Sequence, residues 1–376
     1  MRVSIDVSPA VNGKAGLGRY AASLTAALAA QHPAEVHLFA NVTPGGQWPA
    51  ELATLPRTSV RAGYKFWRLA VLMGHLSGAA WDRLLPHPVI FHATEHLLIP
   101  LRSVRTVLTV HDLIYRLFPQ HHKRLNYWYL NLAMPLYVHR ADHIITVSEA
   151  TKRDLMRLYG TPEHKITVVY EAAAPCFAPP PPARIAETRR RYGLPDRYLL
   201  TVGTIEPRKN LARLVEALAA LRRDDPALRL VVVGARGWLT GSFERAIEQF
   251  GQQEAVICLG YVPDDDLPAL YAGATVSVLA SLYEGFGLPV LEAMACGAPV
   301  ACSATSSVGE VAGQAALTFD PEDGEAIVTT LRRLLADADL REVLRQRGLA
   351  RAAEFSWQRA ARETWEVYER IQTGWP

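Results

Sequence analysis

Short apolar runs alternate with amphipathic segments along most of the chain. In the first half, the apolar runs are Val3–Val7, Val36–Phe39, Val89–His92, Thr106–Val110 and His143–Val147. In the second half, they are Tyr198–Val202, Leu230–Gly234, Val256–Leu259, Val276–Leu279 and Pro299–Ala301. Short apolar strands that alternate with helices are typical of parallel sheets flanked by helices. The pattern therefore predicts an α/β fold with a parallel sheet in each half.

Apolar positions at helical spacing predict the helices between these strands. They are expected at Gly18–Ala30, Glu149–Tyr159, Asn210–Arg223, Phe243–Phe250, Pro263–Ala272, Pro289–Cys296 and Gly324–Ala336. A last helix, about Ser356–Ile371, carries Trp357, Trp365 and Tyr368 at helical spacing. Such a stripe needs a partner surface, and we expect this helix to cross back onto the first half.

A proline-rich segment, Ala172–Ala183, interrupts the alternation. Its four consecutive prolines lack backbone donors and favour an extended chain, so they predict a linker. A chain of 376 residues also suits two domains better than one core. We predict domains at 1–177 and 178–355, with helix 356–376 packed on the first domain. The carboxyl ends of the strands in two doubly wound sheets would then line a cleft between the domains.

Charge is distributed unevenly between the halves. Residues 1–178 hold 18 Lys+Arg and 11 Asp+Glu, the remainder holds 22 and 26, and all 12 histidines lie in the first half. A basic half could face anionic lipid or a phosphate-bearing acceptor, or it could simply be a solvated surface. The chain contains no zinc-finger spacing and no aromatic–basic RNA motif, so we expect no nucleic-acid partner.

The start of the chain lacks a signal-peptide pattern, and no apolar run reaches the ~20 residues of a membrane-spanning helix. Cys176, Cys258, Cys296 and Cys302 form no C-x-x-C pair, and we interpret them as reduced, mostly buried thiols. These features predict a cytoplasmic protein.

The segment Ser281–Gly297 is the first candidate for chemistry. A strand ends near Ala280, a glycine-rich loop follows, and Pro289 lies where a first helical turn begins. Such a loop can offer unpaired backbone N–H groups at a positive helix end, and Glu284 and Glu292 could accept hydrogen bonds from sugar hydroxyls. The alternative is an ordinary turn before a core helix, with Glu292 solvated.

The segment Val202–Asn210 is the second candidate. It also joins a strand to a helix, and it places Arg208 and Lys209 at the start of that helix. Two cations there oppose the helix dipole, which suggests a bound anion such as a diphosphate. The alternative is a solvated basic pair.

Together these segments resemble the retaining glycosyltransferases of family 4, which have the GT-B fold. Glu284 and Glu292, with the seven residues Gly285–Leu291 between them, are similar to the hallmark of that family, and Val202–Asn210 is similar to its phosphate-binding element. Further similar landmarks run from about residue 2 to 370: Gly16–Tyr20, His111–Asp112, Val147–Lys152, Ala295–Val300 and Phe355–Trp357. The resemblance implies two doubly wound Rossmann-like domains facing each other across a cleft. The first would bind the acceptor and the second the nucleotide sugar.

The resemblance also implies a role for each matching residue. Arg208 and Lys209 would neutralise the leaving diphosphate, and Glu292 would hold the ribose. His111 and Glu284 would contact the donor sugar, with His111, Arg208, Lys209 and Glu284 forming the catalytic set. The full donor-binding set expected is Gly16, Gly18, Gly203, Arg208, Lys209, Tyr261, Val262, Glu284, Gly285, Phe286, Gly287, Leu288 and Glu292.

The resemblance implies neither a cofactor nor a metal ion, because the cationic side chains take the place of a metal. We therefore interpret the acidic run Asp264–Asp266 as the cap of a helix rather than as a metal site. Two aromatic–basic stretches, Lys65–Met73 and His121–Tyr129, could lie on a membrane interface or pack as helices on the domain.

One segment departs from the commoner family pattern, because Val169–Ala172 stands where many relatives have a Pro-Asn-Gly turn. The N-terminal segment and the region of Glu171 resemble bacterial mannosyltransferases, which favours GDP-mannose as donor, with a UDP-hexose next. The expected acceptor is a glycan or a lipid-linked intermediate in cell-envelope polysaccharide synthesis.

Other functions on the same fold remain open. A sugar-nucleotide epimerase, a phosphorylase and a non-catalytic nucleotide-sugar-binding protein are the alternatives. A nicotinamide dehydrogenase fits worse, because no G-x-G-x-x-G follows the first strand.

Overall fold

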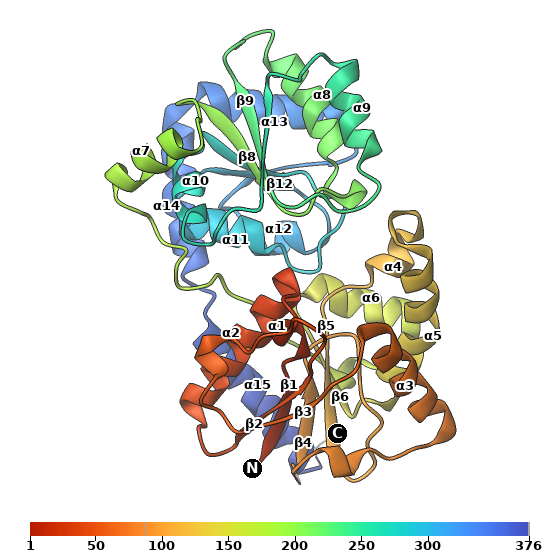
Figure 1. Cartoon of the computed structure of the whole chain (residues 1–376). Coiled ribbons are helices and arrows are strands. Elements are labelled where there is room, and N and C mark those ends of the chain that lie inside the picture. The colour runs from red at the N-terminus through yellow and green to blue at the C-terminus, as the bar shows by residue number, and fades with distance from the viewer. Residues whose placement is uncertain (87, 375–376) are drawn as a thin grey trace. The chain divides into compact units, whose positions relative to one another are not determined.

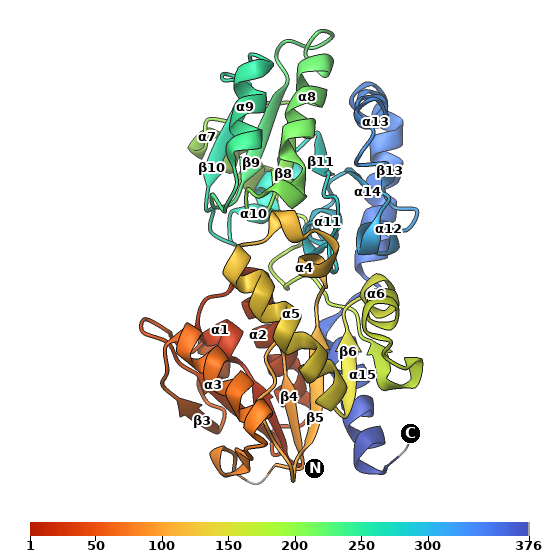
Figure 2. The ribbon, with the colours of Figure 1, turned by 90° about the vertical axis from the view of Figure 1, so that its right-hand side faces the viewer.

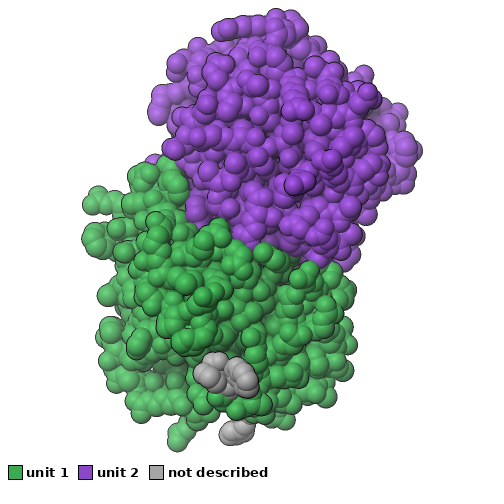
Figure 3. Space-filling view, turned by 180° about the vertical axis from the view of Figure 1, so that it is seen from behind, with its two compact units in different colours: residues 1–171, 356–376 green, residues 172–355 purple. Residues whose placement is uncertain are grey.

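The structure is a computed structural model that describes residues 1–86 and 88–374. The chain divides into two compact units, which Figures 1 and 3 show by residue number and by unit. Unit 1 comprises Met1–Glu171 together with the segment that begins at Ser356, and unit 2 comprises Ala172–Phe355. The boundary at Ala172 lies at the start of the proline-rich segment, slightly before the position expected from the sequence.

Unit 1 contains a parallel sheet of seven strands in the order β3-β2-β1-β4-β5-β6-β7. The strands are β1 (Val3–Asp6), β2 (Val36–Asn41), β3 (Arg57–Val60), β4 (Ile90–Ala93), β5 (Arg105–Val110), β6 (His143–Thr146) and β7 (Ile166–Val168). The helices are α1 (Ser8–Val11), α2 (Ala15–Gln31), α3 (Tyr64–Ser77), α4 (Ile114–Leu117), α5 (Arg124–Arg140), α6 (Glu149–Tyr159) and α15 (Trp357–Gln372). Helices α2 and α15 cover one side of this sheet, and α3 and α5 cover the other (Figure 1).

The aromatic stripe of α15 packs onto unit 1. Trp365 stacks on His32 with ring centroids 3.5 Å apart. The hydroxyl of Tyr368 lies 2.6 Å from Nδ1 of His92, a fully buried residue of β4. His92 also lies 2.7 Å from the hydroxyl of Thr109, so both of its ring nitrogens have partners inside unit 1. His92 is therefore a structural histidine that joins α15 to the sheet.

Unit 2 contains a parallel sheet of six strands in the order β10-β9-β8-β11-β12-β13. The strands are β8 (Tyr198–Val202), β9 (Arg229–Val233), β10 (Val256–Gly260), β11 (Val276–Leu279), β12 (Val300–Ser303) and β13 (Leu317–Phe319). The helices are α7 (Pro182–Arg191), α8 (Leu211–Leu221), α9 (Gly241–Gln249), α10 (Leu267–Gly273), α11 (Leu288–Ala295), α12 (Ser306–Ala312), α13 (Gly324–Ala336) and α14 (Ala338–Ala352).

Both sheets have a topological switch point beside their first strand. The chain runs outward from β1 through β2 to β3 and then returns to the other side of β1 with β4. In unit 2, it runs from β8 through β9 to β10 and returns with β11. Loops after the two central strands diverge at such a point and leave a crevice at their carboxyl ends, where ligands of open α/β sheets bind.

Two expectations about the elements and thiols are wrong. Helix α10 begins at Leu267, because Pro263–Asp266 forms a turn before it. Of the four thiols, Cys176 and Cys258 are exposed, so only half of them are buried. In the part of the chain that the structure describes, no helix has the length and hydropathy needed to span a membrane.

Candidate active site

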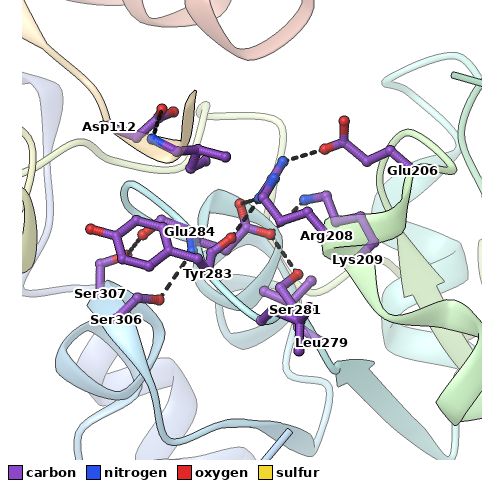
Figure 4. A network of polar contacts seen from close by, with 12 residues as sticks. Asp112, Glu206, Arg208, Lys209, Leu279, Ser281, Tyr283, Glu284, Ser306 and Ser307 are labelled. Carbon is purple, nitrogen blue, oxygen red and sulfur yellow. Dashed lines mark hydrogen bonds and ion pairs between the residues drawn. The ribbon is translucent and has the colours of Figure 1, made fainter. Parts of the chain in front are cut away.

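A cluster of charged side chains lies at the switch point of unit 2. Arg208 and Lys209 belong to the short 3₁₀ helix η5 (Pro207–Lys209) after β8, and Glu284 lies in the loop after β11. Arg208 Nη1 is 2.5 Å from Oε2 of Glu284, and Lys209 Nζ is 2.6 Å from Oε1 (Figure 4). The two segments singled out from the sequence are therefore joined by direct ion pairs.

The cluster is nearly closed to water and balanced in charge. Glu206 forms a second ion pair with Arg208, and the carboxylates of Glu206 and Glu284 are both buried. Burial alone would raise the pKa of Glu284, but the charges of Arg208 and Lys209 outweigh it and lower this pKa to about 2. Glu284 is therefore a carboxylate at neutral pH, held by two cations.

Three serines fix the loop that carries Glu284 (Figure 4). Ser281 donates to Oε1 of Glu284 at 2.6 Å, and Ser307 donates to its backbone carbonyl at 2.8 Å. The backbone N–H of Glu284 donates to Oγ of Ser306 at 3.0 Å. Ser306 has a φ of 56°, an uncommon backbone conformation that tends to occur at functional sites.

These contacts add residues that the sequence reading missed. The N–H of Glu284 is not free for a ligand, because Ser306 accepts it. Glu206, Ser281, Ser306 and Ser307 were not in the predicted set. Ser306 and Ser307 follow β12, the neighbour of β11, so adjacency at the carboxyl edge of the sheet is the signal that could have found them.

Glu292 lies inside helix α11, as the sequence predicts. Its side chain is only 3% exposed, and Oε2 accepts a hydrogen bond from the hydroxyl of Tyr271 at 3.1 Å. The solvated alternative for Glu292 is therefore wrong. The helix begins at Leu288 after Gly287, whose φ of 104° favours glycine. Phe286, in the same loop, is buried and packs edge-on against Phe355.

The remaining donor-site candidates of unit 2 differ in their environment. A Cβ on Gly203, where φ is 149°, would lie 3.1 Å from Cε of Lys209, so this glycine leaves room for the lysine. Tyr261 and Val262 follow β10, which β9 and β8 separate from β11. Tyr261 is 78% exposed, whereas Val262 is buried, so the two neighbours differ in what they present to solvent.

In unit 1, His111 follows β5 and is held on both sides. Nδ1 is 3.1 Å from Oε1 of Glu171, and Nε2 is 2.9 Å from the backbone carbonyl of Thr94. Burial alone would lower the pKa of His111, but the carboxylate of Glu171 and the carbonyl of Thr94 raise it above the ordinary value. Because both ring nitrogens face acceptors, the doubly protonated imidazolium satisfies all of these contacts.

The two glycines at the start of α2 have different surroundings. Gly16 is exposed, and a Cβ there would meet nothing within 4 Å. Gly18 is buried, and a Cβ would lie 2.9 Å from the carbonyl oxygen of Pro9, so it is needed for packing against α1. Just before α2, Lys14 forms an ion pair with Glu95, which follows β4.

The acidic run before α10 was expected to cap this helix, but Asp266 instead forms contacts with α7 and the residue that follows it. Asp266 occupies the N-cap position, but its side chain does not cap the helix. It accepts from Arg184 at 2.7 Å, from Arg191 at 3.0 Å and from the hydroxyl of Tyr192 at 2.7 Å, which ties α10 to α7. The residues that the structure describes contain no cluster of three His, Cys, Asp or Glu that could hold a metal ion.

Comparisons with known proteins match this architecture. Residues 15–173 match the family model Glycosyltransferase Family 4, and residues 185–351 match Glycosyl transferases group 1. O-antigen chain mannosyltransferase B of Escherichia coli is 32% identical over 99% of this chain and 100% of that protein. D-inositol 3-phosphate glycosyltransferase of Salinispora arenicola is 35% identical over 61% of this chain and 55% of that protein.

Solved structures share the fold at lower identity. Sucrose-phosphate synthase of Thermosynechococcus elongatus has a TM-score of 0.78 at 20% identity, and each chain is covered completely. WaaG, a glycosyltransferase involved in lipopolysaccharide biosynthesis, has a TM-score of 0.73 at 18% identity over 97% of this chain and 99% of that one. HepE of Anabaena, solved with UDP and glucose, has a TM-score of 0.73 at 17% identity over 98% of this chain and 99% of that one.

Two Rossmann-like units, with an Arg–Lys–Glu cluster at the second switch point, define a glycosyltransferase of the GT-B fold. This class transfers a sugar from an activated donor to an acceptor. The chain belongs to glycosyltransferase family 4, also described as glycosyl transferases group 1, and is a hexosyltransferase.

Proposed function

We propose that the chain transfers mannose from GDP-mannose, with retention of configuration, to a glycan or lipid-linked acceptor of a cell-envelope polysaccharide. The observation that carries this proposal is the 32% identity to O-antigen chain mannosyltransferase B over 99% of the chain. The match covers 100% of that relative, so it includes both units.

Arg208 and Lys209 are suited to bind the donor diphosphate. In the structure they already hold the oxyanion of Glu284 at 2.5 and 2.6 Å, so their donors are positioned for anionic oxygens. Negative charge grows on the leaving diphosphate as the bond from the sugar carbon breaks, and fixed cations stabilise it best where water is scarce. These two residues therefore act mainly on the transition state.

Glu284 is suited to accept hydrogen bonds from donor-sugar hydroxyls rather than to attack the sugar. With a pKa of about 2 and contacts to Arg208, Lys209 and Ser281, it is a weak base and a weak nucleophile. In the proposed reaction, the acceptor oxygen bonds to the anomeric carbon from the face that the diphosphate leaves. The acceptor proton passes to an oxygen of that diphosphate, so no protein nucleophile is needed.

We further propose that transfer needs no metal ion, because the cations of the cluster fill that role. The role of His111 at the donor sugar also remains a proposal. Glu171 and Thr94 occupy both ring nitrogens, and the backbone N–H of His111 donates to Nε2 of His96, so a sugar contact would use the C–H edge of the ring.

A transfer assay tests the proposal. The purified protein is incubated with GDP-mannose, UDP-glucose or ADP-glucose and an octyl α-mannobioside, in EDTA and then in magnesium, and the product is analysed by mass and by NMR. We expect an α-mannoside from GDP-mannose in EDTA. Transfer only from UDP-glucose would contradict the proposal that GDP-mannose is the donor. Loss of product in EDTA would contradict the proposal that transfer needs no metal ion. Binding of a nucleotide sugar without any transfer would favour the non-catalytic alternative.

A further inference from the structure

Large apolar side chains are exposed on two helices of unit 1 in unusual density. Phe66 is 69% exposed, Leu125 72% and Trp128 66%. Of the thirteen large hydrophobic residues exposed in the part of the chain that the structure describes, eight belong to α3 or α5. They are Tyr64, Phe66, Leu69, Met73, Leu76, Leu125, Trp128 and Leu132, which we call the α3–α5 face.

The eight side chains point outward on one side of unit 1. On α3 the exposed positions from Phe66 to Leu76 follow helical spacing, and the opposite stripe, with Val71 and Leu72, is buried. On α5, Leu125, Trp128 and Leu132 are exposed, whereas Ala133, Met134 and Tyr137 are buried in the same core as the α3 stripe. Because both helices cover the same side of the sheet, their exposed stripes form one outer surface.

Contacts between the helices hold this surface together. Arg68 of α3 donates to the side chain of Asn126 of α5 at 2.8 Å, and its guanidinium lies 3.7 Å from the ring centroid of Tyr129. Tyr129 donates its hydroxyl to the backbone carbonyl of Arg68 at 3.1 Å. Figure 2 shows α3 and α5 side by side. The apolar residues therefore belong to a preformed patch rather than to two separate helices.

All charges along these helices have the same sign. Neither Tyr64–Ser77 nor Arg124–Arg140 contains an aspartate or glutamate, and no acidic residue occurs between Asp112 and Asp142. Exposed basic residues border the apolar positions, among them Lys65, Lys123, Arg124 and Arg140. An apolar surface with aromatic residues, bordered by lysines and arginines, is typical of helices that lie in a membrane interface.

We propose that the α3–α5 face docks on the surface of an anionic lipid bilayer, with the apolar side chains among the acyl chains and the lysines and arginines on lipid phosphates. Charge favours this occupant over a second copy of the chain. A symmetric dimer through this face would bring the same cations together, whereas anionic headgroups complement them. The proposal uses unit 1 only and does not depend on the donor proposed for unit 2.

The surface also adjoins the carboxyl edge of the sheet in unit 1. Tyr64, the first residue of α3, lies under the ammonium group of Lys14, which is 4.4 Å from its ring centroid. Lys14 pairs with Glu95 after β4, at the switch point of this sheet. A lipid-linked acceptor would therefore reach this edge of unit 1 directly from the bilayer.

Vesicle binding by the whole chain tests the proposal. Co-sedimentation is measured with vesicles of phosphatidylglycerol and phosphatidylcholine and with vesicles of phosphatidylcholine alone. We expect binding to the anionic vesicles that weakens with salt. The variants Phe66→Ser/Trp128→Ser and Lys65→Glu/Arg124→Glu should each lower the affinity about tenfold or more. The variant Val343→Ser/Arg347→Glu, on exposed positions of α14 in unit 2, is the matched control and should bind as the wild type does.

Several results would overturn the proposal. They are equal binding by all three variants, equal binding to neutral vesicles, and no binding by a folded wild type. A wild-type dimer that the α3–α5 variants dissociate, without vesicle binding, would assign the face to a second copy instead. Calorimetric binding of GDP by the same variants separates this test from that of the donor site. It should be unchanged, because the substituted side chains belong to unit 1 and are exposed.

Discussion

Glu284 brings together the residues on which transfer is expected to depend. Arg208 and Lys209 hold its two oxygens, and Ser281 supports one of them from the same loop. Glu206 provides the second carboxylate, so two positive and two negative side chains balance. A donor diphosphate would compete with these carboxylates for the same cations. The separate roles of Glu284 and Lys209 can therefore be tested by removing each side chain in turn.

Substituting each partner separately should distinguish charge stabilisation from sugar contact. Lys209→Ala should lower turnover about 10²- to 10³-fold and weaken GDP binding, because a cation facing the leaving diphosphate is lost. Glu284→Gln should also lower turnover but keep GDP binding, because it removes a competing carboxylate. Turnover is measured with GDP-mannose and affinity by calorimetry. If Glu284→Gln lost GDP binding as completely as Lys209→Ala, the assigned roles would be wrong.

His111 should be protonated over an extended pH range because of Glu171. The pKa of His111 is raised in the folded state, so its ion pair stabilises the fold fully below the unfolded value of about 6.5. This contribution is lost as pH rises through the raised folded-state pKa. Glu171→Gln should therefore cost ~2 kcal/mol at pH 6 and less at pH 9, as measured by urea unfolding. A cost that is independent of pH would show that Glu171 does not act through the charge of His111.

Sequence reasoning identifies Arg208, Lys209, Glu284 and Glu292 because their spacing follows a family motif. It does not show that Glu284 pairs with both cations, because the two segments are 75 residues apart and meet only through strand order. The sequence does not predict Ser306 for the same reason, because Ser306 is distant in sequence from the loop of Glu284 that it contacts.

At the scale of elements, the central strands and the edge strand β10 follow from apolar runs, whereas the edge strands β3, β7 and β13 do not. The strands β8 and β11 have the predicted bounds, because they are buried on both faces and read as continuous apolar segments. The edge strand β3, with sequence Arg-Thr-Ser-Val, is polar and half exposed, so its pattern resembles a loop. The strands β7 and β13 are only three residues long.

The loop-to-helix junction before α11 should depend on glycine at position 287. Gly287 has a φ of 104°, so an alanine there is strained even though Val308 Cγ2 lies 3.5 Å from the added Cβ. Gly287→Ala should destabilise the fold by ~1–2 kcal/mol. Gly324→Ala, at the first position of α13 with open space around it, is the control and should be nearly neutral. Equal effects in urea unfolding would refute the conformational argument.

At the scale of the whole molecule, two sheets of similar strand order carry different chemistry. The proline-rich segment correctly marks the region where unit 1 ends, because its prolines cannot join a sheet, and Pro182 begins α7. The aromatic stripe of α15 indicates that the helix needs a partner, but only the structure identifies His32 and His92 as its contacts. The charge count shows from the sequence alone that the first half is basic. That exposed apolar residues gather on α3 and α5 can be seen only in the structure.

The central claim is that the cluster of unit 2 binds the donor nucleotide. Calorimetric titration of GDP into the wild type, into Arg208→Ala and into the control Arg347→Ala, all in EDTA, tests it most directly. We predict binding by the wild type and by Arg347→Ala, and about ten- to a hundredfold weaker binding by Arg208→Ala. Equal affinity for all three proteins, with circular dichroism showing each one folded, would contradict the claim and place the nucleotide elsewhere.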